Sequence, residues 1–399
     1  MQNKINVELN FSLGEYADRL AAVRAQMSDK GIDTLLVTNP SNMAWLTGYD
    51  GWSFYVHQCV IISSSGGAPL WYGRAMDANG AKRTSYLAHE NILSYTDHYI
   101  QNPDAHPMDF LCQEFLEPRG WTKGTIAVEM DNYYFTAKAY QQLVIGAPQA
   151  NFVDATGLVN WCRSVKSPQE IAYMRVAARI VENMHHAIYD MIEPGLPKNR
   201  LVGEIYRVGC EGVDGMGGDY PAIVPLLPTG ADASAAHLTW DDKPFRLGEG
   251  TFFEVAGCYK RYHCPLSRTI FLGTPPDKFI RAEAALQEGL ENGLMAAKPG
   301  NRCADIALEL QKAMVKYGID RGGSRCGYSI GLSYPPDWGE HTMSLRDSDM
   351  TILKPGMLFH FMPGIWQDDW GLELTETILI TETGAEPLCH YPRTLQSKG

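Results

Sequence analysis

The stretch Glu373-Leu-Thr-Glu-Thr-Ile-Leu-Ile380 is the last of four strand-like runs in the second half of the chain. Runs of this length, rich in β-branched and aromatic residues, are typical of strands. The other three are residues 251–256, 267–272 and 357–362, and helical periodicity predicts long helices at about 199–211, 278–297 and 303–317. Helices followed by strands, twice over, predict an α+β domain whose two related halves surround a curved antiparallel sheet.

The first 150 or so residues follow a different pattern. Apolar residues at helical spacing predict a helix over 16–30, and a short apolar strand follows at 34–38. Residues 60–62 and 69–72 are strand-like and flank a Ser- and Gly-rich turn, which predicts a hairpin. This alternation of helix and strand predicts an α/β domain with a mixed sheet.

A domain boundary is expected near residue 160. Just after it, Ser167 is a good N-cap, Pro168 fits the first helical position, and Glu170 completes a capping box. We therefore predict an N-terminal domain of residues 1–160 and a second domain of residues 161–399.

Composition limits the classes of function. The 34 Lys and Arg against 46 Asp and Glu leave a net charge of −12, so an acidic surface argues against a nucleic-acid partner. Nine scattered cysteines without a C-x-x-C pair argue against a disulfide framework or a zinc cluster. The start of the chain lacks the features of a signal peptide, and no apolar run of about 18 residues is present. We expect a cytoplasmic protein that does not insert into membranes.

Several motifs of the second half occur together and in order. They are Ser267-Arg-Thr269, Gly327-Tyr-Ser-Ile-Gly-Leu332, Leu353-Lys-Pro-Gly-Met357, Met362-Pro-Gly-Ile365 and the stretch from Thr375 to Gly384. This set resembles the creatinase, prolidase and methionine-aminopeptidase superfamily, which has the pita-bread fold. Residues 35–48 resemble the N-terminal domain of creatinase and prolidase. The resemblance implies a creatinase/prolidase-like domain at 1–160 and a pita-bread catalytic domain at 161–399.

The departures from the family are as informative as the matches. Peptidases of the family hold two divalent metals with two aspartates, a histidine and two glutamates. The corresponding positions here are Glu254, Pro265, Tyr328, Met362 and Thr375. Divalent metals of this kind require oxygen or nitrogen ligands such as carboxylates and imidazole, and of this set only Glu254 retains such a ligand. We therefore expect no metal and no cofactor, and no metal-activated water.

The fold has a metal-free precedent in creatinase. Ala235-Ala-His237 resembles the segment that carries the catalytic histidine of creatinase, and Phe54 matches an aromatic residue that reads its substrate. Val56 stands where creatinase has an arginine, which makes creatine an unsuitable substrate. The set from Tyr328 to His341, with residues 359–364, instead resembles the ectoine hydrolase branch. That resemblance implies opening of the cyclic amidine ring of ectoine, and of hydroxyectoine, to N-acetylated 2,4-diaminobutyrate.

This chemistry assigns roles to three candidate catalytic residues. An amidinium is already electrophilic, so its opening requires a carboxylate and a proton shuttle rather than a metal. Glu254 could hold the amidinium, activate water or attack directly, and the sequence leaves these three roles open. His237 is the expected proton shuttle, because an imidazole can take up and release a proton near neutral pH. Tyr328 is the third candidate by position.

Further residues are expected to bind the substrate. Arg325 could clamp the substrate carboxylate, while Trp52 and Tyr55 could cover the cation from the other subunit of a homodimer. The full set of candidates, for several of which a structural role is equally open, is Arg325, Glu340, His341, His360, Glu373, Glu376, Trp52, Phe54 and Tyr55. Arg268 is expected to hold the sheet together instead.

Two other functions compete with this interpretation. The first is a metal-dependent Xaa-Pro peptidase whose ligands lie elsewhere in the alignment, or another creatinase-type amidinohydrolase. The second is a pseudopeptidase that uses its cavity to bind a partner. The long charged extensions common in such modules are absent, and Glu254 with His237 favours chemistry.

Overall fold

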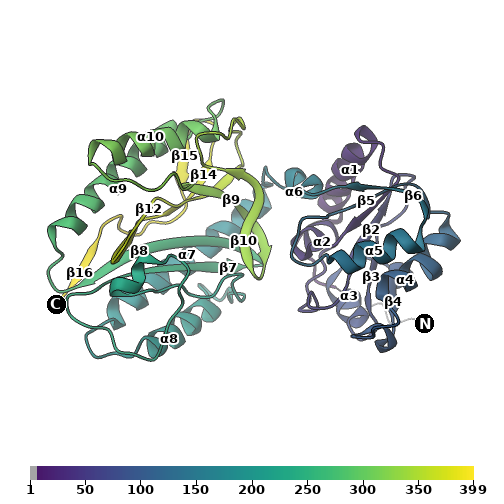
Figure 1. Cartoon of the computed structure of the whole chain (residues 1–399), viewed down its shortest axis with the longest axis horizontal. Helices are drawn as coiled ribbons and strands as arrows, with labels where there is room; N and C mark the ends of the chain where they lie inside the picture. Colours follow the sequence, from purple (N-terminus) through teal and green to yellow (C-terminus); the bar gives the residue numbers. More distant parts are fainter. Residues whose placement is uncertain (1–6) are drawn as a thin grey trace. The chain divides into compact units, whose positions relative to one another are not determined.

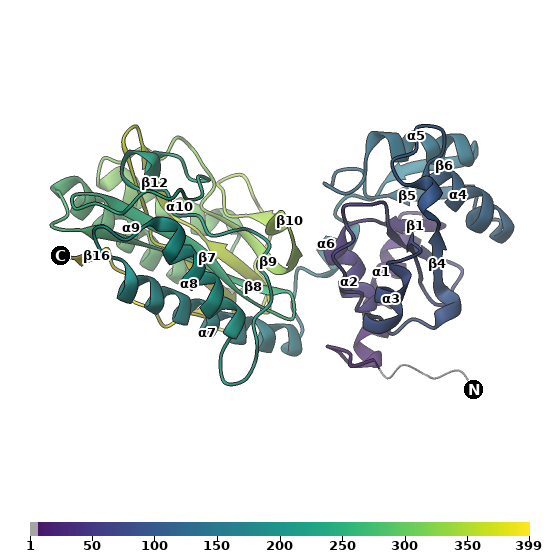
Figure 2. The ribbon, with the colours of Figure 1, turned by 90° about the horizontal axis from the view of Figure 1, so that it is seen from below.

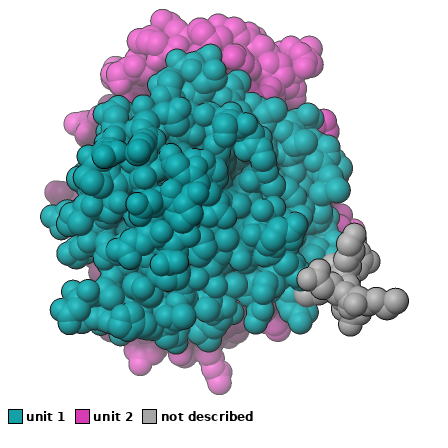
Figure 3. All heavy atoms as spheres, turned by 90° about the vertical axis from the view of Figure 1, so that its right-hand side faces the viewer, with its two compact units in different colours: residues 1–163 teal, residues 164–399 magenta. Residues whose placement is uncertain are grey.

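The computed structural model describes residues 7–399 and divides the chain into two compact units, Met1–Arg163 and Ser164–Gly399. Figure 3 colours the two units separately. Within the described residues, no helix combines the length and the apolar character that a membrane span requires.

Unit 1 is built on a six-stranded mixed sheet in the order β4-β3-β2-β1-β5-β6 (Figure 1). β1 and β2 run antiparallel, as do β2 and β3, whereas β3–β4, β1–β5 and β5–β6 are parallel. The predicted mixed sheet and its hairpin are therefore confirmed. The strands are β1 Thr34–Val37, β2 Cys59–Ser63, β3 Leu70–Arg74, β4 Ile92–Tyr95, β5 Lys123–Val128 and β6 Gln149–Asp154.

Helices pack on this sheet and connect its strands. Those of unit 1 are α1 Leu13–Asp29, α2 Pro40–Thr47, α3 Ala78–Thr84, α4 Pro107–Phe110, α5 Ala137–Gly146 and α6 Leu158–Cys162, with short helical turns η1 His89–Asn91, η2 Asp97–Tyr99, η3 Leu111–Leu116 and η4 Glu117–Arg119. Two apolar clusters form the core of the unit. Val37, Val60 and Trp71 belong to one of them, and Leu36, Ile61 and Tyr72 belong to the other.

Unit 2 holds an eight-stranded sheet in which β15, β14, β11, β9, β8 and β16 follow one another, with β7 paired to β8 and β10 paired to β9. All of these pairs are antiparallel except β8–β16. The strands are β7 Gly250–Tyr259, β8 Tyr262–Leu272, β9 Gly327–Tyr334, β10 Asp337–Ser344, β11 Leu358–Phe361, β14 Glu376–Ile380, β15 Ala385–Pro387 and β16 Gln396–Lys398, and β12 Gly364–Gln367 with β13 Trp370–Glu373 forms a separate hairpin.

Four long helices flank this sheet: α7 Pro168–Met191, α8 Lys198–Glu211, α9 Asp277–Ala296 and α10 Cys303–Lys316, with a short turn, η5 Gly230–Ser234. Figures 1 and 2 show the α7–α8 pair and the α9–α10 pair at the strands of this unit. The predicted capping box is present, because Ser167 and Glu170 each accept the other's backbone N–H. Gly257 permits the close contact of α7 with β7, since a Cβ there would lie 2.0 Å from the Ala177 carbonyl oxygen.

Candidate active site

The centre of the candidate site lies where β7, β8 and the residue before β14 meet. Glu254 of β7 is directly opposite Ser267 of β8 in the antiparallel ladder, so the two side chains share a face of the sheet. Thr375 donates its N–H to the Ser267 carbonyl at 3.2 Å, and its hydroxyl accepts the Ser267 N–H at 2.7 Å. The Thr375 hydroxyl thereby occupies a fixed place beside the face that carries Glu254.

A chain of uncharged hydrogen-bonding groups crosses this centre. The Trp338 indole N–H donates to the Tyr328 hydroxyl at 2.8 Å, and that hydroxyl lies 3.1 Å from Nδ1 of His360. On its other side, Nε2 of His360 lies 2.9 Å from the Thr375 hydroxyl. Burial, and secondarily Arg325, lowers the pKa of His360 to about 3. His360 is therefore a neutral imidazole at neutral pH.

Glu254 is buried beside this chain of groups, with 4% of its surface exposed. Its Oε1 lies 3.8 Å from Nδ1 of His360. Because His360 is neutral, this approach does not provide a compensating charge. Burial raises the pKa of Glu254 well above its ordinary value, and the negative charges of Glu373 and Asp337 raise it further.

Glu373 is a second, fully buried carboxyl group at the end of β13. The Trp366 indole N–H donates to its Oε1 at 3.0 Å. Burial raises the pKa of Glu373 to about 7, although the Ser267 hydroxyl and the Trp366 indole oppose the shift. Apart from this approach of the Ser267 hydroxyl to the Glu373 carboxyl group, neither Oε2 of Glu373 nor Oγ of Ser267 has a hydrogen-bond partner in the described part of the chain.

This arrangement favours one kind of ligand. Over residues 7–399, neither Glu254 nor Glu373 forms an ion pair with a lysine or an arginine. Buried polar groups are normally hydrogen-bonded, and buried charges are normally paired. A cation with several N–H donors would satisfy both carboxyl groups and the Ser267 hydroxyl together.

One cation does lie near the site, on its accessible side. The Arg325 guanidinium lies over the Tyr328 ring, 4.6 Å from its centroid, and is exposed. It also approaches the Ser344 hydroxyl at 3.3 Å. Arg325 is thus placed to meet an anionic group of a ligand whose cationic part reaches the buried carboxyl groups.

The donor set does not fit the two metals of the family's peptidases. Pro265 and Met362 supply no hard-metal ligand, and the Thr375 hydroxyl and Tyr328 are engaged with His360. Residues 7–399 contain no cluster of three or more His, Cys, Asp or Glu side chains able to hold a metal ion. We therefore derive no step through a metal.

Two predicted pocket residues are placed elsewhere. Glu376 is adjacent to Thr375, yet its Oε1 binds Arg268 at 2.7 Å and Arg393 at 2.8 Å. The expectation that Glu376 lines the pocket is not supported, because successive residues of a strand point to opposite faces. Glu340 instead forms a fully buried ion pair with Lys166 at 2.5 Å. Arg268 holds the sheet together, as expected.

The histidines differ from the expectation as well. His237 is exposed in the turn after η5, and no hydrogen bond joins it to Glu254 within the described range. His341 is half-exposed and pairs with Asp337 at 2.9 Å, at the edge of the sheet rather than beside Glu254. The structure therefore brings together Glu254, Tyr328, His360 and Glu373, with Arg325 beside them.

The N-terminal candidates belong to unit 1. Trp52 is 56% exposed and Tyr55 is 67% exposed, whereas Phe54 is half-buried. The Trp52 and Phe54 rings are 4.8 Å apart, and Phe54 also contacts Tyr134. These exposed rings are available to contact a ligand or another protein surface.

Sequence reasoning missed several members of the site. Trp338 and Trp366 each direct an indole N–H at a functional side chain, and Thr375 and Ser267 supply hydroxyl groups. A signal was present for Thr375, since it occupies a former ligand position. No signal identified the tryptophans, because their contacts depend on strand pairings between β9 and β10 and between β12 and β13.

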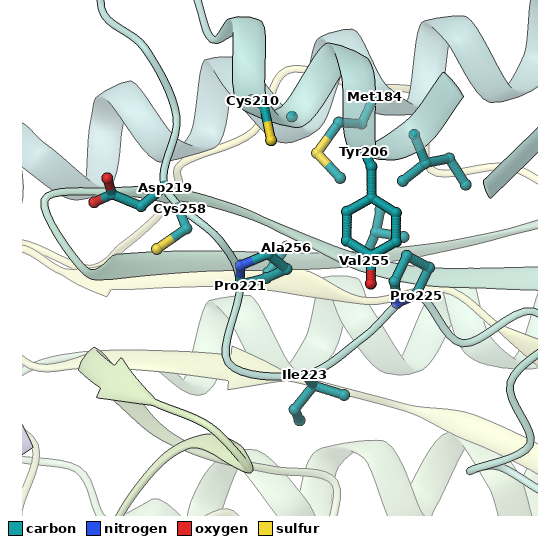
Figure 4. Close-up of a pocket in the computed structure, with 12 residues that line it drawn as sticks. Met184, Tyr206, Cys210, Asp219, Pro221, Ile223, Pro225, Val255, Ala256 and Cys258 are labelled. Carbon is teal, nitrogen blue, oxygen red and sulfur yellow. The ribbon is translucent and has the colours of Figure 1, made fainter. Parts of the chain in front are cut away.

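A separate apolar cavity lies between α7, α8 and β7 (Figure 4). Met184, Tyr206, Val255 and Cys258 are among its lining residues, and none of the four side chains of the cluster lines it. Its one carboxylate, Asp219, is engaged with the backbone N–H of Arg261 at 2.9 Å. This cavity offers packing volume rather than a second set of reactive groups.

Comparison with known proteins identifies the family. Residues 172–382 match the model of metallopeptidase family M24, and residues 19–165 match the creatinase/prolidase N-terminal domain. The chain belongs to metallopeptidase family M24. The chain is 66% identical to the ectoine hydrolase of Halomonas elongata, over 98% of this chain and 99% of that protein. The predicted resemblance to the ectoine hydrolase branch is confirmed.

More distant relatives share the fold. The chain is 24% identical to a creatinase from a Bacillus species, over 97% of this chain and 93% of the relative. The structure of a prolidase from Thermococcus sibiricus superposes with a TM-score of 0.83 at 17% identity, covering 97% of this chain and 100% of that one. A dipeptidase from Pyrococcus horikoshii gives a TM-score of 0.80 at 21% identity, covering 95% and 100%. These likenesses confirm the two-domain pita-bread fold.

Proposed function

We propose that this hydrolase opens the cyclic amidine ring of ectoine, and of hydroxyectoine, to N-acetyl-2,4-diaminobutyrate without a metal. One observation carries the proposal. Glu254 and Glu373 are both buried, the charge of Glu373 raises the pKa of Glu254, and neither carboxyl group is paired with a lysine or arginine among the described residues. An amidinium supplies one positive charge and two N–H donors. The 66% identity to an ectoine hydrolase supports the same substrate.

The proposed roles follow from the geometry. Glu254 meets the amidinium and either activates water for addition to the central carbon or adds to that carbon itself. Tyr328, held by Trp338 and His360, is placed beside Glu254 to hydrogen-bond the ring or the adding oxygen. Arg325 takes the substrate carboxylate at the accessible side. The role of His237 as proton shuttle stays a prediction, since among the described residues no hydrogen bond or ion pair joins His237 to Glu254, Tyr328, His360 or Glu373.

The ligand set supports a metal-free reaction. A proline and a methionine at former ligand positions cannot hold a hard divalent cation, and the amidinium already carries the charge that a Lewis acid would otherwise provide. A homodimer is part of the proposal, in which Trp52, Phe54 and Tyr55 of one subunit cover the substrate of the other. Light scattering that gives the mass of a monomer would contradict the dimer, and unchanged KM in Trp52→Ala would contradict the cover.

The direct test is incubation with ectoine in excess chelator, followed by product mass. We expect the substrate mass plus one water, unchanged turnover with and without chelator, and loss of turnover in Glu254→Gln. The control is Glu382→Gln, an identical change at an exposed turn after β14. Cleavage of a proline dipeptide that requires Mn²⁺ or Zn²⁺, without conversion of ectoine, would overturn the proposal. Incubation in H₂¹⁸O for a single turnover then separates the two roles of Glu254. Addition of activated water puts ¹⁸O into the product, whereas direct attack transfers an unlabelled glutamate oxygen to the product and leaves the ¹⁸O on Glu254.

A further inference from the structure

Four hydrogen-bonded side chains cross the site in a row, and groups that can only donate hold both ends of that row. The four are Trp338, Tyr328, His360 and Thr375. At one end, the Trp338 indole N–H donates to the Tyr328 hydroxyl at 2.8 Å. At the other end, the backbone N–H of Ser267 donates to the Thr375 hydroxyl at 2.7 Å. An indole N–H and a backbone N–H have no acceptor capacity, so each hydroxyl oxygen already accepts one hydrogen bond.

His360 joins the two hydroxyl groups. Its Nδ1 lies 3.1 Å from the Tyr328 hydroxyl, and its Nε2 lies 2.9 Å from the Thr375 hydroxyl. The imidazole is fully buried and is neutral, because burial lowers its pKa to about 3. A neutral imidazole carries one N–H hydrogen, and each hydroxyl group carries one hydrogen. These three hydrogens serve two contacts, so one hydroxyl hydrogen must point away from His360.

Two arrangements of these hydrogens satisfy both contacts of the imidazole. In the first, Tyr328 donates to Nδ1, the proton of His360 is on Nε2, and the hydrogen of the Thr375 hydroxyl points elsewhere. In the second, Thr375 donates to Nε2, the proton of His360 is on Nδ1, and the hydrogen of the Tyr328 hydroxyl points elsewhere. The hydrogen bond that one ring nitrogen makes therefore determines which hydroxyl group donates outside the row.

Two observations favour the second arrangement. Oε1 of Glu254 lies 3.8 Å from Nδ1 of His360, and a carboxyl oxygen attracts an N–H hydrogen and repels a nitrogen lone pair. The first arrangement would leave the hydrogen of Thr375 without an acceptor. This hydroxyl is fully buried, and within residues 7–399 it contacts Nε2 of His360 and the N–H of Ser267, both of which already supply a hydrogen in that arrangement. A buried hydroxyl hydrogen without an acceptor is unfavourable.

We propose that His360 is a positioning residue that carries its proton on Nδ1 and thereby restricts the Tyr328 hydroxyl to the role of a hydrogen-bond donor in the reaction. This inference rests on the proposed ring-opening function. The Trp338 N–H and the Nδ1–H of His360 fill both acceptor positions of the Tyr328 oxygen. The sequence placed His360 among the residues that bind the substrate, whereas this inference has it act through Tyr328.

This restriction decides which contact Tyr328 makes during ring opening. A Tyr328 oxygen with both acceptor positions filled cannot accept an N–H of the amidinium, so its hydrogen meets the oxygen that adds to the ring carbon, from water or from Glu254. A hydrogen bond to one lone pair of that oxygen leaves the other directed at the carbon. Burial raises the pKa of the Tyr328 hydroxyl well above its ordinary value, so Tyr328 keeps its proton throughout.

Nuclear magnetic resonance of the protein labelled with [¹⁵N]histidine tests the position of the proton directly. Long-range ¹⁵N–¹H correlations differ between the Nδ1–H and Nε2–H forms of a neutral imidazole. Because the chain has 11 histidines, the signals of His360 are identified as those absent from His360→Asn. We expect the Nδ1–H form in the free enzyme. An Nε2–H form or an imidazolium at neutral pH would overturn the inference.

A double-mutant cycle tests whether His360 acts through Tyr328. We expect Tyr328→Phe and His360→Leu each to lower kcat by about 10²-fold, the loss that a misplaced group causes, with the Kd for ectoine by calorimetry within about threefold. In the Tyr328→Phe background, His360→Leu should lower kcat by less than about threefold further, because the hydroxyl that it positions is already absent. His360→Asn, whose amide N–H can replace the Nδ1–H, should retain kcat within about tenfold. The matched control His98→Leu, at an exposed position of η2, should leave kcat unchanged.

The outcomes separate this inference from the function on which it rests. Losses in His360→Leu and Tyr328→Phe that multiply would overturn it. A weakened Kd with an unchanged kcat in Tyr328→Phe would also overturn it, since Tyr328 would then bind the ring. If His360→Leu does not fold, the position of the proton and the rescue by His360→Asn still decide. If ectoine is not converted but His360 has the Nδ1–H form, the proposed function fails while the assignment of the proton stands.

Discussion

The ion pair between Lys166 and Glu340 allows a test of whether Glu340 stabilises the fold or binds the substrate. Glu340 stands in the segment expected to line the pocket, but its Oε2 contacts Lys166 Nζ at 2.5 Å, and both side chains are 1% exposed. Lys166 Nζ also contacts the Ser164 carbonyl at 3.3 Å. Gly331 packs so closely on the pair that a Cβ there would lie 2.5 Å from Glu340 Oε1 and 2.9 Å from Lys166 Cε. Little room is left for water to solvate either charge.

Glu340→Gln should therefore destabilise unit 2 without weakening ectoine binding. Removing one partner of a buried pair leaves an uncompensated charge and costs about 3–5 kcal/mol. For a domain of this size, at about 2–4 °C per kcal/mol, this lowers the midpoint of thermal unfolding by about 6–20 °C. The double variant Lys166→Met with Glu340→Gln should recover much of the loss, because the Lys166 charge that Glu340→Gln leaves uncompensated is then removed as well.

The assay is thermal and urea unfolding of the four members of this double-mutant cycle, followed by calorimetry with ectoine where each is folded. Glu382→Gln serves as the control for the substitution itself. A loss below about 1 kcal/mol would refute the reasoning about burial. A folded Glu340→Gln protein whose Kd for ectoine is weakened more than tenfold would instead restore Glu340 to the pocket.

Three further predictions concern the cluster around Glu254. Burial raises the pKa of Glu373 from 4.5 to about 7, so the stability that its protonated form contributes is present below pH 4.5 and is lost as pH rises toward 7. Between pH 4.5 and pH 8, the free energy of unfolding measured in urea titrations should therefore fall by about 3 kcal/mol less in Glu373→Gln than in the unmodified protein. Equal falls in the two proteins would contradict this. Thr375→Val keeps the shape but deletes the hydroxyl that contacts Ser267 N–H and His360, so the free energy of unfolding should fall by about 1–3 kcal/mol, whereas the exposed Thr383→Val should have no effect. Trp338→Phe removes the N–H that holds the Tyr328 hydroxyl; steady-state kinetics should give a lower kcat, and an unchanged kcat would exclude Tyr328 from the reaction.

Local signals in the sequence were sufficient for much of the fold. The helices expected at 199–211, 278–297 and 303–317 are Lys198–Glu211, Asp277–Ala296 and Cys303–Lys316. Apolar periodicity and capping act within one or two turns, so a single chain displays them directly. β10 was not predicted as a strand, because its residues are largely polar and its register with β9 shifts twice.

Only part of the site could be predicted from the sequence. Glu254 and Tyr328 were found because they occupy the positions of former metal ligands. Glu376 was predicted to line the pocket, but it faces Arg268 and Arg393. The preceding residue, Thr375, is the one that faces the cluster. The partners of Glu373 and Tyr328 come from separate hairpins, and their proximity is a property of strand pairing rather than of sequence spacing.

Charge balance explains why these substitutions belong together. In the family's peptidases, two aspartates and two glutamates carry four negative charges against two divalent cations. In this chain, replacement of ligands by Pro265, Met362 and Thr375 leaves Glu254, joined by Glu373, and two carboxyl groups that share one proton carry a single negative charge. A single negative charge matches a singly charged amidinium, whereas a site that kept all four carboxylates would bind the substrate with excess negative charge and repel its carboxylate. The Tyr328 and Thr375 hydroxyls stand at two of the vacated positions without adding charge, and the neutral His360 bonds to both. Restoring a carboxylate with Thr375→Glu should therefore weaken ectoine binding in calorimetry more than the isosteric Thr375→Val does, and equal Kd values for the two variants would contradict this charge argument.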